Sequence, residues 1–220
     1  MSNYASTTTP PRTLTEMEQQ RLLKVSGEHR DGFRDHVIFA LALGAGLREH
    51  EIVALNVQDV LAFNAQLPAG AVGGPAAAGD EGQYVRRRVL LWKFKGSARA
   101  GGRQQEVILS DQVRYKLQKY LQQIRGRLLI DPLFRSRKGQ RLSTRQLREL
   151  FATWQQRAGF ERRFRFHDLR HTYCTNVYRE SGRDITQVQR LARHSRIETS
   201  LIYTHASDEE ILATVKKLRS

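Results

Sequence analysis

Only one part of the 220-residue chain has the pattern of β-structure, and helical patterns lie on both sides of it. The segment VRRRVLLWKFK (85–95) is rich in β-branched and aromatic residues, and RQQEVILS (103–110) follows it after GSARAGG. Two such runs joined by a glycine-containing link predict an antiparallel hairpin with a basic tip. We therefore expect an α+β fold that is mainly α-helical, with helices around a small antiparallel sheet or hairpin.

Helix start and stop signals place the other elements. Residues 15–18, Thr-Glu-Met-Glu, form a capping box that predicts a helix to about Val25. An apolar face over residues 33–41 predicts a second helix, which the glycines at 44 and 46 interrupt before another helix starts near Arg48. The remaining helices are expected over 111–126, over 143–159 with Ser143 as cap, and in three short segments toward the C-terminus, one of them capped by Asp184.

Residues 62–83 differ in composition from the rest of the chain. They hold five of its sixteen glycines, at 70, 73, 74, 79 and 82, and are otherwise dominated by alanine. Such a segment has little apolar surface to bury, so it predicts a long loop.

Charge and composition narrow the possible functions. With 37 Lys and Arg against 22 Asp and Glu, the net charge is +15, which favours a polyanionic partner: nucleic acid first, an anionic membrane surface second. The longest apolar run, residues 37–47, is too short to cross a bilayer. The single cysteine, Cys174, excludes an internal disulfide and a cysteine-rich zinc site. The N-terminus lacks a signal-peptide pattern, so we expect a cytoplasmic protein.

The sequence HDLRH (167–171) places His167, Arg170 and His171 on one face of a helix. Taken alone, this pattern is typical of a solvated basic surface. Further along, His194 falls in a turn after a capped helix, and Tyr203 follows nine residues later. Each of these two residues alone would more often be structural.

Taken together, five short motifs in a fixed order carry a resemblance. GLREHE, WKFKG, HDLR, ARHS and IYTH resemble the signature of the tyrosine recombinase family, the phage integrases and Xer-type recombinases, over about residue 14 to the C-terminus. The resemblance identifies six catalytic positions: Arg48, Lys95, His167, Arg170, His194 and the nucleophile Tyr203.

The resemblance implies a site-specific DNA recombinase that cuts and rejoins strands through a 3′-phosphotyrosyl link, with no metal, ATP or other cofactor. Arg48 and Arg170 would hold the phosphate, since planar guanidinium groups fit its oxygens. Lys95 would protonate the leaving 5′-oxygen, and His194 would bond a non-bridging oxygen. Glu51, one turn after Arg48, would orient the catalytic side chains without contacting the DNA itself.

Three positions leave alternatives open. Lys93 lies on the same strand face as Lys95, and Lys95 is chosen because Gly96 follows it, as in the family. Arg193 stands where the family usually has glycine; a positive φ there would cost about 1 kcal/mol, and its side chain could add a phosphate contact. His171 is as easily a packing residue, and we leave it out of the catalytic set.

The resemblance also sets expectations for domains and partners. Residues 1–12 would be a flexible lead and 13–220 the catalytic domain, with a C-terminal helix over 207–219 that could dock on a neighbouring protomer. The family's usual N-terminal core-binding domain is absent, so the chain would be a short single-domain recombinase or a fragment. Expected partners are double-stranded DNA carrying specific recombination sites, further copies forming a dimer or tetramer on DNA, and possible accessory DNA-bending proteins.

Other functions remain open from the sequence. The same residues serve type IB-like topoisomerases and hairpin-resolving enzymes. A non-catalytic DNA-binding regulator could keep the fold without the reaction. A basic RNA-binding domain is supported by charge alone.

Overall fold

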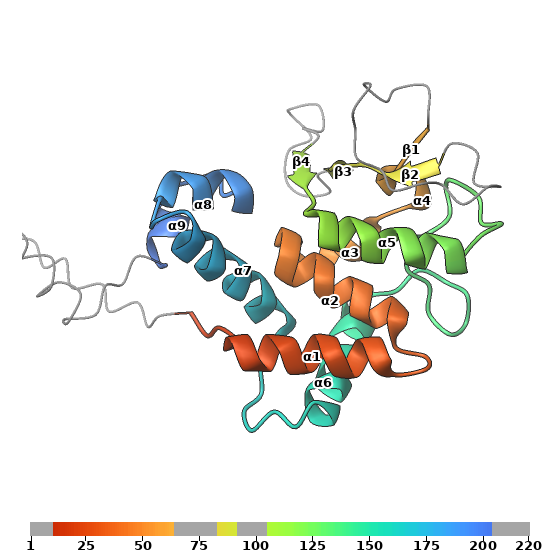
Figure 1. Ribbon diagram of the computed structural model, residues 1–220, viewed down its shortest axis with the longest axis horizontal. Helices are drawn as coiled ribbons and strands as arrows, with labels where there is room; N and C mark the ends of the chain where they lie inside the picture. Colours follow the sequence, from red (N-terminus) through yellow and green to blue (C-terminus); the bar gives the residue numbers. More distant parts are fainter. Residues whose placement is uncertain (1–10, 64–82, 92–104, 204–220) are drawn as a thin grey trace, which may run out of the picture.

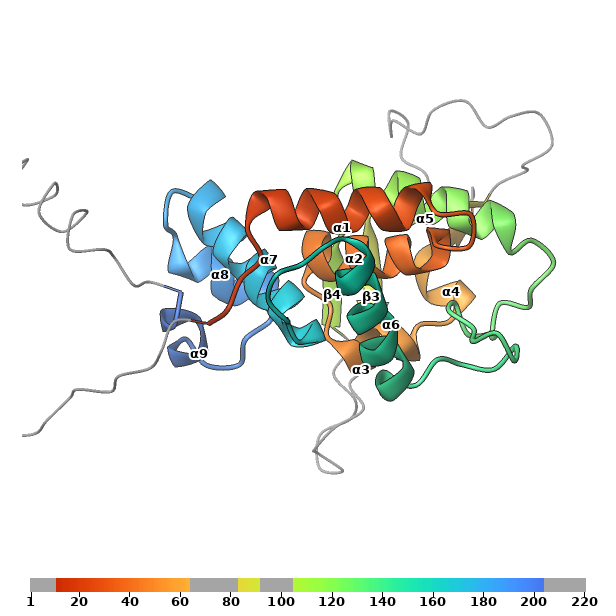
Figure 2. The same ribbon diagram turned by 90° about the horizontal axis from the view of Figure 1, so that it is seen from below.

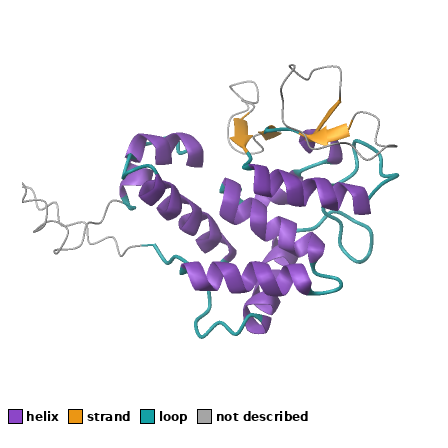
Figure 3. Cartoon of the chain, in the orientation of Figure 1, coloured by secondary structure: helices purple, strands orange, loops and turns teal. Residues whose placement is uncertain are grey.

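The computed structural model describes residues 11–63, 83–91 and 105–203 (Figure 1). Over these residues the chain is mainly helical with small two-stranded antiparallel sheets (Figure 3), so the expected α+β class is confirmed. In chain order the elements are α1 (Glu16–Glu28), α2 (Phe33–Ala45), α3 (Glu49–Ala54), α4 (Val57–Val60), β1 (Leu61–Phe63), β2 (Gln83–Val85), β3 (Arg88–Leu91), β4 (Gln105–Ile108), α5 (Asp111–Gln123), α6 (Thr144–Arg157), α7 (Phe166–Glu180), α8 (Ile185–Ala192) and α9 (Glu198–Leu201).

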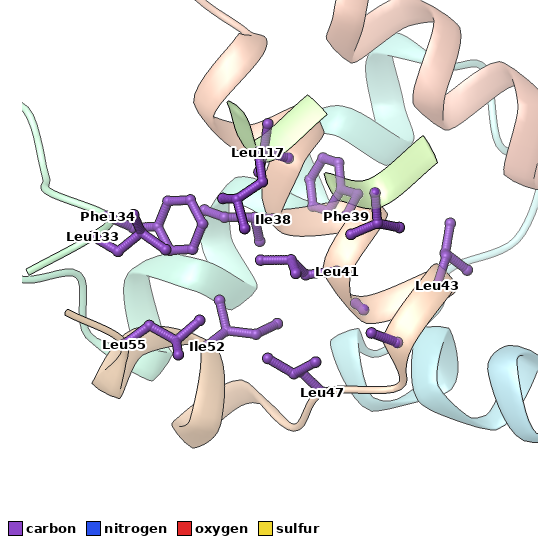
Figure 4. Close-up of a cluster of buried hydrophobic side chains, with 14 of the residues drawn as sticks. Ile38, Phe39, Leu41, Leu43, Leu47, Ile52, Leu55, Leu117, Leu133 and Phe134 are labelled. Atoms are coloured by element: carbon purple, nitrogen blue, oxygen red, sulfur yellow. The ribbon is translucent and has the colours of Figure 1, made fainter. Parts of the chain in front are cut away.

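Helix α2 is the centre of the main core. It packs against α1, α5 and α7, and all its residues from Asp35 to Leu43 are buried. Figure 4 shows its side chains Ile38, Phe39 and Leu41 among apolar groups from α3, α5 and the segment after α5. A helix that is apolar on nearly every side must be surrounded by other elements. In the part of the chain that the structure describes, no helix is both long and apolar enough to cross a membrane.

The predicted helix starts are confirmed. Glu18 N donates to Thr15 Oγ1 at 3.2 Å, and Thr15 N donates to Glu18 Oε2 at 2.7 Å, as a capping box requires. Ser143 and Asp184 also cap their helices. Helix α1 continues three residues past Val25 to Glu28. Ser26, within this extension, is buried and donates to Leu22 O at 2.7 Å.

The hairpin is confirmed where the structure describes it. Strands β3 and β4 are antiparallel, with Val89 paired to Val107 and both side chains buried. The tip, including Lys93 and Lys95, lies outside the described residues.

The loop predicted over residues 62–83 is wrong at both ends. Residues Leu61–Phe63 form strand β1, which pairs with β2 at residues Gln83–Val85. The side chains of Leu61 and Val85 are buried and connect this strand pair to the core. The glycine- and alanine-rich composition of the segment between the two strands gave no sign of this pairing. Residues 64–82 lie outside the described part of the chain.

A second, smaller apolar cluster lies beside the main core. It consists of the buried residues Tyr173, Cys174, Val188, Ala192 and Tyr203. Helices α7, α8 and α9 supply or flank these residues and lie together at one end of the molecule in both views (Figures 1 and 2). The motifs HDLRH and ARHS and the tyrosine of the third motif, Tyr203, meet at this end.

Gly46, which ends α2, offers a sharp test of packing next to these motifs. Its φ is +60°, and an added Cβ would lie 2.3 Å from the Tyr173 ring. Gly126 also has a positive φ, +85°, but a Cβ there would meet nothing within 4 Å. Both alanine variants should lose about 1–2 kcal/mol for the left-handed backbone, and Gly46→Ala about 1–3 kcal/mol more for overpacking. Equal free energies of unfolding for the two variants in urea titrations would contradict the packing described.

Candidate active site

Arg48 and Glu51 lie at the start of α3, immediately after the turn that ends α2. Arg48 N donates to Glu51 Oε2 at 2.8 Å, and Arg48 Nη1 donates to Glu51 Oε1 at the same distance. The Glu51 side chain is 7% exposed, whereas that of Arg48 is 28% exposed. Burial alone would raise the pKa of Glu51, but Arg193 and Arg48 outweigh it and hold the pKa below its ordinary value. Glu51 is therefore an anion that fixes a partly accessible arginine.

Arg170, on α7, is 3% exposed and joins the ends of two other helices. Its Nη1 donates to the carbonyl of Gly46, the C-cap of α2, and its Nη2 donates to the carbonyl of Ala192, the last residue of α8. Carbonyl groups at helix C-termini lack intrahelical partners and form the negative end of the helix dipole. Burial and the charge of Arg48 lower the pKa of Arg170. The guanidinium is thus held in place by two separate backbone segments.

The hydroxyl of Tyr203 contacts His171. Tyr203 Oη lies 2.7 Å from His171 Nδ1, and the tyrosine is 8% exposed. His171 is in turn edge-on to His167, with ring centroids 4.6 Å apart. Burial and the neighbouring Cys174 raise the pKa of Tyr203. In this arrangement the phenol is neutral, and its hydroxyl is hydrogen-bonded to the imidazole of His171.

His194 lies in the turn between α8 and α9, beside the ring of Tyr203. Its Nδ1 is 2.8 Å from Ser200 Oγ, and its ring is stacked against that of Tyr203 with centroids 6.4 Å apart. The residue before it, Arg193, has φ 58° and ψ 43°, so the turn does need the left-handed conformation that glycine would adopt most easily. The Arg193 side chain is 5% exposed and lies against Glu51, with Nη2 to Oε2 at 2.6 Å.

Three histidines of this cluster share one electrostatic environment. Burial and the charge of Arg170 lower the pKa of His167. The same two causes lower the pKa of His194 to about 4. Burial, the nearby His167 and Arg170 lower the pKa of His171 to about 4. All three rings are therefore uncharged at neutral pH. A neutral imidazole can accept a proton or donate a hydrogen bond without adding charge.

The structure brings together most of the residues named from the sequence. Arg48, Glu51, His167, Arg170, His194 and Tyr203 form one continuous set of contacts and charge interactions. Lys95 and its alternative Lys93 lie outside the described residues. Within residues 11–63, 83–91 and 105–203, no group of three or more His, Cys, Asp or Glu side chains is arranged to hold a metal ion.

This cluster can be compared with known proteins. Residues 83–210, more than half of the chain, match the sequence profile of the Phage integrase family. The chain belongs to this family. Among characterised relatives, it is 29% identical over 200 residues to tyrosine recombinase XerC of Vibrio cholerae, and 25% identical over 202 residues to tyrosine recombinase XerD of Oceanobacillus iheyensis. These alignments cover 90% of this chain but only 55% and 58% of the relatives, so this integrase-family chain spans little more than half their length.

Solved structures share the fold of this integrase-family chain. XerA recombinase matches with a TM-score of 0.70 and 23% identity, covering 96% of this chain and 66% of that one. XerH recombinase, solved bound to its difH substrate before cleavage, matches with a TM-score of 0.68 and 21% identity over 96% of this chain and 55% of that one. The catalytic domain of bacteriophage HP1 integrase matches with a TM-score of 0.57 and 19% identity, covering 94% of this chain and 95% of that one. The fold is therefore that of a tyrosine recombinase catalytic domain.

Two members of the cluster in this integrase-family chain were not in the expected catalytic set. His171 was left out as a packing residue, yet its ring nitrogen is the one nearest to the Tyr203 hydroxyl. Its position on the same helix face as His167 was the available signal. Cys174, one turn further along α7, is completely buried and also contributes to the raised pKa of Tyr203. Nothing in the sequence around Cys174 indicated this contact.

The lowered histidine pKa values predict how stability changes with pH. In an unfolded chain a histidine has a pKa of about 6.5, whereas His171 and His194 have values of about 4 in the folded chain. Between these values the unfolded chain binds more protons, so the free energy of unfolding falls as the pH is lowered from 6.5 toward 4, and the full stability is present above 6.5. Unfolding midpoints measured from pH 7 to 4.5 should show this fall.

Asparagine variants identify the groups responsible. His171→Asn and His194→Asn should each flatten the pH dependence, because each removes one group that protonates on unfolding. His50 is exposed on α3, and His50→Asn is the matched control for replacing a histidine outside the cluster. A slope unchanged in all three variants would exclude the two histidines as its source.

Proposed function

We propose that this chain is the catalytic part of a site-specific DNA recombinase that cleaves and rejoins DNA through Tyr203, without a metal ion or ATP. The observation that carries the proposal is the placement of one buried tyrosine hydroxyl 2.7 Å from the imidazole of His171, next to the arginines of α3 and α7. A phenol is a weak nucleophile at neutral pH until a base or a positive field activates it. Both are present around Tyr203.

In the proposed reaction, Tyr203 Oη attacks the phosphorus of a DNA phosphodiester. The phenolic proton passes to Nδ1 of His171, which is neutral at pH 7 because its pKa is about 4. A bond forms between Tyr203 and phosphorus, and the bond from phosphorus to the 5′-oxygen of the next nucleotide breaks. The result is a 3′-phosphotyrosyl link and a free 5′-hydroxyl. Attack by a 5′-hydroxyl of another strand reverses the steps, so no external energy source is needed.

The two arginines are suited to the charge that develops in this step. The Arg48 side chain is partly accessible and fixed by Glu51, and Arg170 is fixed by two backbone carbonyls. Guanidinium groups that are already oriented stabilise a developing negative charge without first reorganising. His194, beside the tyrosine ring, is proposed to donate to a non-bridging oxygen, and Lys95 to protonate the leaving 5′-oxygen.

Double-stranded DNA with specific recombination sites is the proposed partner. The net charge of +15 favours a polyanion. A cavity of about 520 Å³ is lined by three arginines, Arg12, Arg163 and Arg165, together with Phe164, Asp168 and His171. The DNA-bound XerH structure supports the same class of ligand. We further propose assembly of several copies on DNA, with the 207–219 segment docking between them, and a cytoplasmic location.

Trapping of covalent adducts tests the reaction. The protein is incubated in EDTA and without ATP with a DNA library covering the flanks of its own gene, and the reaction is stopped with SDS. We expect covalent protein–DNA adducts whose DNA-linked peptide, mapped by mass spectrometry, contains Tyr203. Adducts that form only with divalent metal, or that map to another residue, would refute the proposal. So would DNA binding without any adduct on sites that the wild-type protein selects from the library.

The trapped sites then distinguish recombination from related chemistry. A plasmid carrying two marked copies of the site should exchange its flanking segments. Relaxation of supercoils without exchange would instead indicate a topoisomerase-like activity of the same residues.

A further inference from the structure

Arg193 is a third arginine of the same cluster, and neither the family signature nor the proposed reaction assigns it a role. Its side chain is 95% buried at the turn after α8. Of its three guanidinium nitrogens, Nη2 pairs with Glu51, while Nε and Nη1 are buried without a hydrogen-bond partner among the described residues. A buried charge that is only partly paired is costly, and the left-handed backbone at Arg193 adds to that cost. Stability alone does not account for an arginine here.

The contacts of Glu51 indicate what Arg193 does. Glu51 Oε1 accepts from the Arg48 side chain, and Oε2 accepts from both Arg48 N and Arg193 Nη2. Arg48 and Arg193 are therefore held by the two oxygens of one carboxylate. Arg48 lies at the start of α3, and Arg193 lies in the turn after α8. Glu51 and Arg193 are 142 residues apart in the sequence.

The turn that contains Arg193 also carries two other parts of the site. Its preceding residue, Ala192, supplies the carbonyl that holds Arg170, and its following residue is His194, which stacks on Tyr203. The ion pair between Arg193 and Glu51 thus connects the segment holding Arg48 to the segment holding Arg170 and His194. Loss of this pair would allow the two segments to shift relative to each other.

The charges of the cluster lead to the same conclusion. Arg48, Arg170 and Arg193 supply three positive charges, and Glu51 is the carboxylate that neutralises one of them. Among these four side chains two positive charges remain, and both would attract the negative charge that builds up on the phosphoryl oxygens when a fifth oxygen bonds to phosphorus. Without Arg193, one surplus charge would remain.

We propose that Arg193 is a positioning residue for DNA cleavage: through Glu51 it fixes Arg48 relative to Arg170 and His194, and it adds the second surplus positive charge felt by the transition state. This inference rests on the proposed function. It concerns the rate of the chemical step and not DNA binding, because the buried guanidinium does not face solvent.

Three substitutions test the inference. Arg193→Gly removes the charge and suits the left-handed backbone, Arg193→Met removes the charge but keeps the side-chain volume, and Arg193→Lys keeps the charge. We expect the glycine and methionine variants to form adducts on the trapped site about 10- to 100-fold more slowly, as misplaced catalytic groups do. DNA affinity should stay within about twofold of the wild type, because the contacts of exposed arginines with phosphate are unchanged. Arg193→Lys should recover a large part of the rate.

Thermal unfolding separates positioning from structural support. Arg193→Gly relieves the backbone strain and removes the unpaired nitrogens, but it also leaves a cavity and takes one cation from Glu51, so every rate is measured below the unfolding midpoint of each variant. Arg193→Met, which keeps the side-chain volume, should cleave slowly while it is fully folded. In the Glu51→Gln background, Arg193→Gly should cause little further loss of rate, because both changes break one interaction. A wild-type cleavage rate in Arg193→Gly, or a loss of rate that only follows a loss of stability, would overturn the proposal.

A readout without DNA cleavage keeps this test separate from the proposed function. The guanidinium NMR signals of Arg48, assigned with Arg48→Lys, report whether that side chain is fixed. We expect them to shift and broaden in Arg193→Gly and to be retained in Arg193→Lys. Unchanged Arg48 signals in Arg193→Gly would overturn the positioning role even if the wild type cleaves DNA. Changed signals in a protein that forms no adducts would uphold the link through Glu51 and refute only the proposed reaction.

Discussion

Tyr203→Phe is expected to abolish covalent protein–DNA adducts completely while DNA affinity stays within about twofold of the wild type. The substitution removes the single oxygen that would bond to phosphorus in the proposed reaction. The aromatic ring, which stacks on His194 and packs in the small cluster with Cys174 and Val188, is kept. Loss of the hydrogen bond to His171 should lower the free energy of unfolding by only about 1 kcal/mol.

A second tyrosine provides the control. Tyr178 lies on α7 and packs against the same small cluster, whereas the hydroxyl hydrogen-bonded to His171 belongs to Tyr203. Tyr178→Phe should form adducts at the wild-type rate on the same DNA. Adducts that persist in Tyr203→Phe would show that another residue is the nucleophile, and the proposed reaction would then be wrong.

Arg170→Lys is expected to lose both stability and cleavage. The guanidinium of Arg170 bonds two carbonyls at once, those of Gly46 and Ala192, and one ammonium group cannot reach both. At least one buried carbonyl would be left unpaired, at a cost of about 1–3 kcal/mol in the free energy of unfolding. Adduct formation should fall about 100-fold or more, because a planar guanidinium that two carbonyls already orient is replaced by an ammonium group without that fixed orientation.

The cleavage defect of Arg170→Lys must be separated from unfolding. Adduct rates are measured at a temperature well below the unfolding midpoint of each variant, so that every protein is folded. Arg179 is exposed on the same helix, and Arg179→Lys should match the wild type in both stability and rate. A folded Arg170→Lys protein that cleaves DNA at the wild-type rate would exclude Arg170 from the phosphate site.

The helices could be predicted because their signals are local. The capping box at Thr15, the caps at Ser143 and Asp184, and the left-handed Gly46 all act on residues within four positions along the chain. The strand pair β1–β2 was missed for the opposite reason. Its two three-residue strands are separated by a segment of unrelated composition, and so short a strand gives almost no periodic signal of its own.

The candidate site was predicted as a set of residues but not as an arrangement. The order of the motifs identified Arg48, His167, Arg170, His194 and Tyr203, because the family resemblance depends on residue type and order. The order of the motifs did not indicate that His171 would form a hydrogen bond with the Tyr203 hydroxyl, because these residues are 32 positions apart in the sequence.

The sequence by itself therefore determined the helices, the class of fold and the residue types available for chemistry. The tertiary structure decided which of those residues contact one another. Arg193 shows the difference most clearly: its sequence context indicated a strained turn and a possible phosphate contact, whereas the folded chain brings it onto Glu51, 142 residues away. Capping and periodicity depend on neighbours along the chain. A contact between Glu51 and Arg193 depends on how α3 and α8 pack around α2 and α7, and no local pattern encodes that packing.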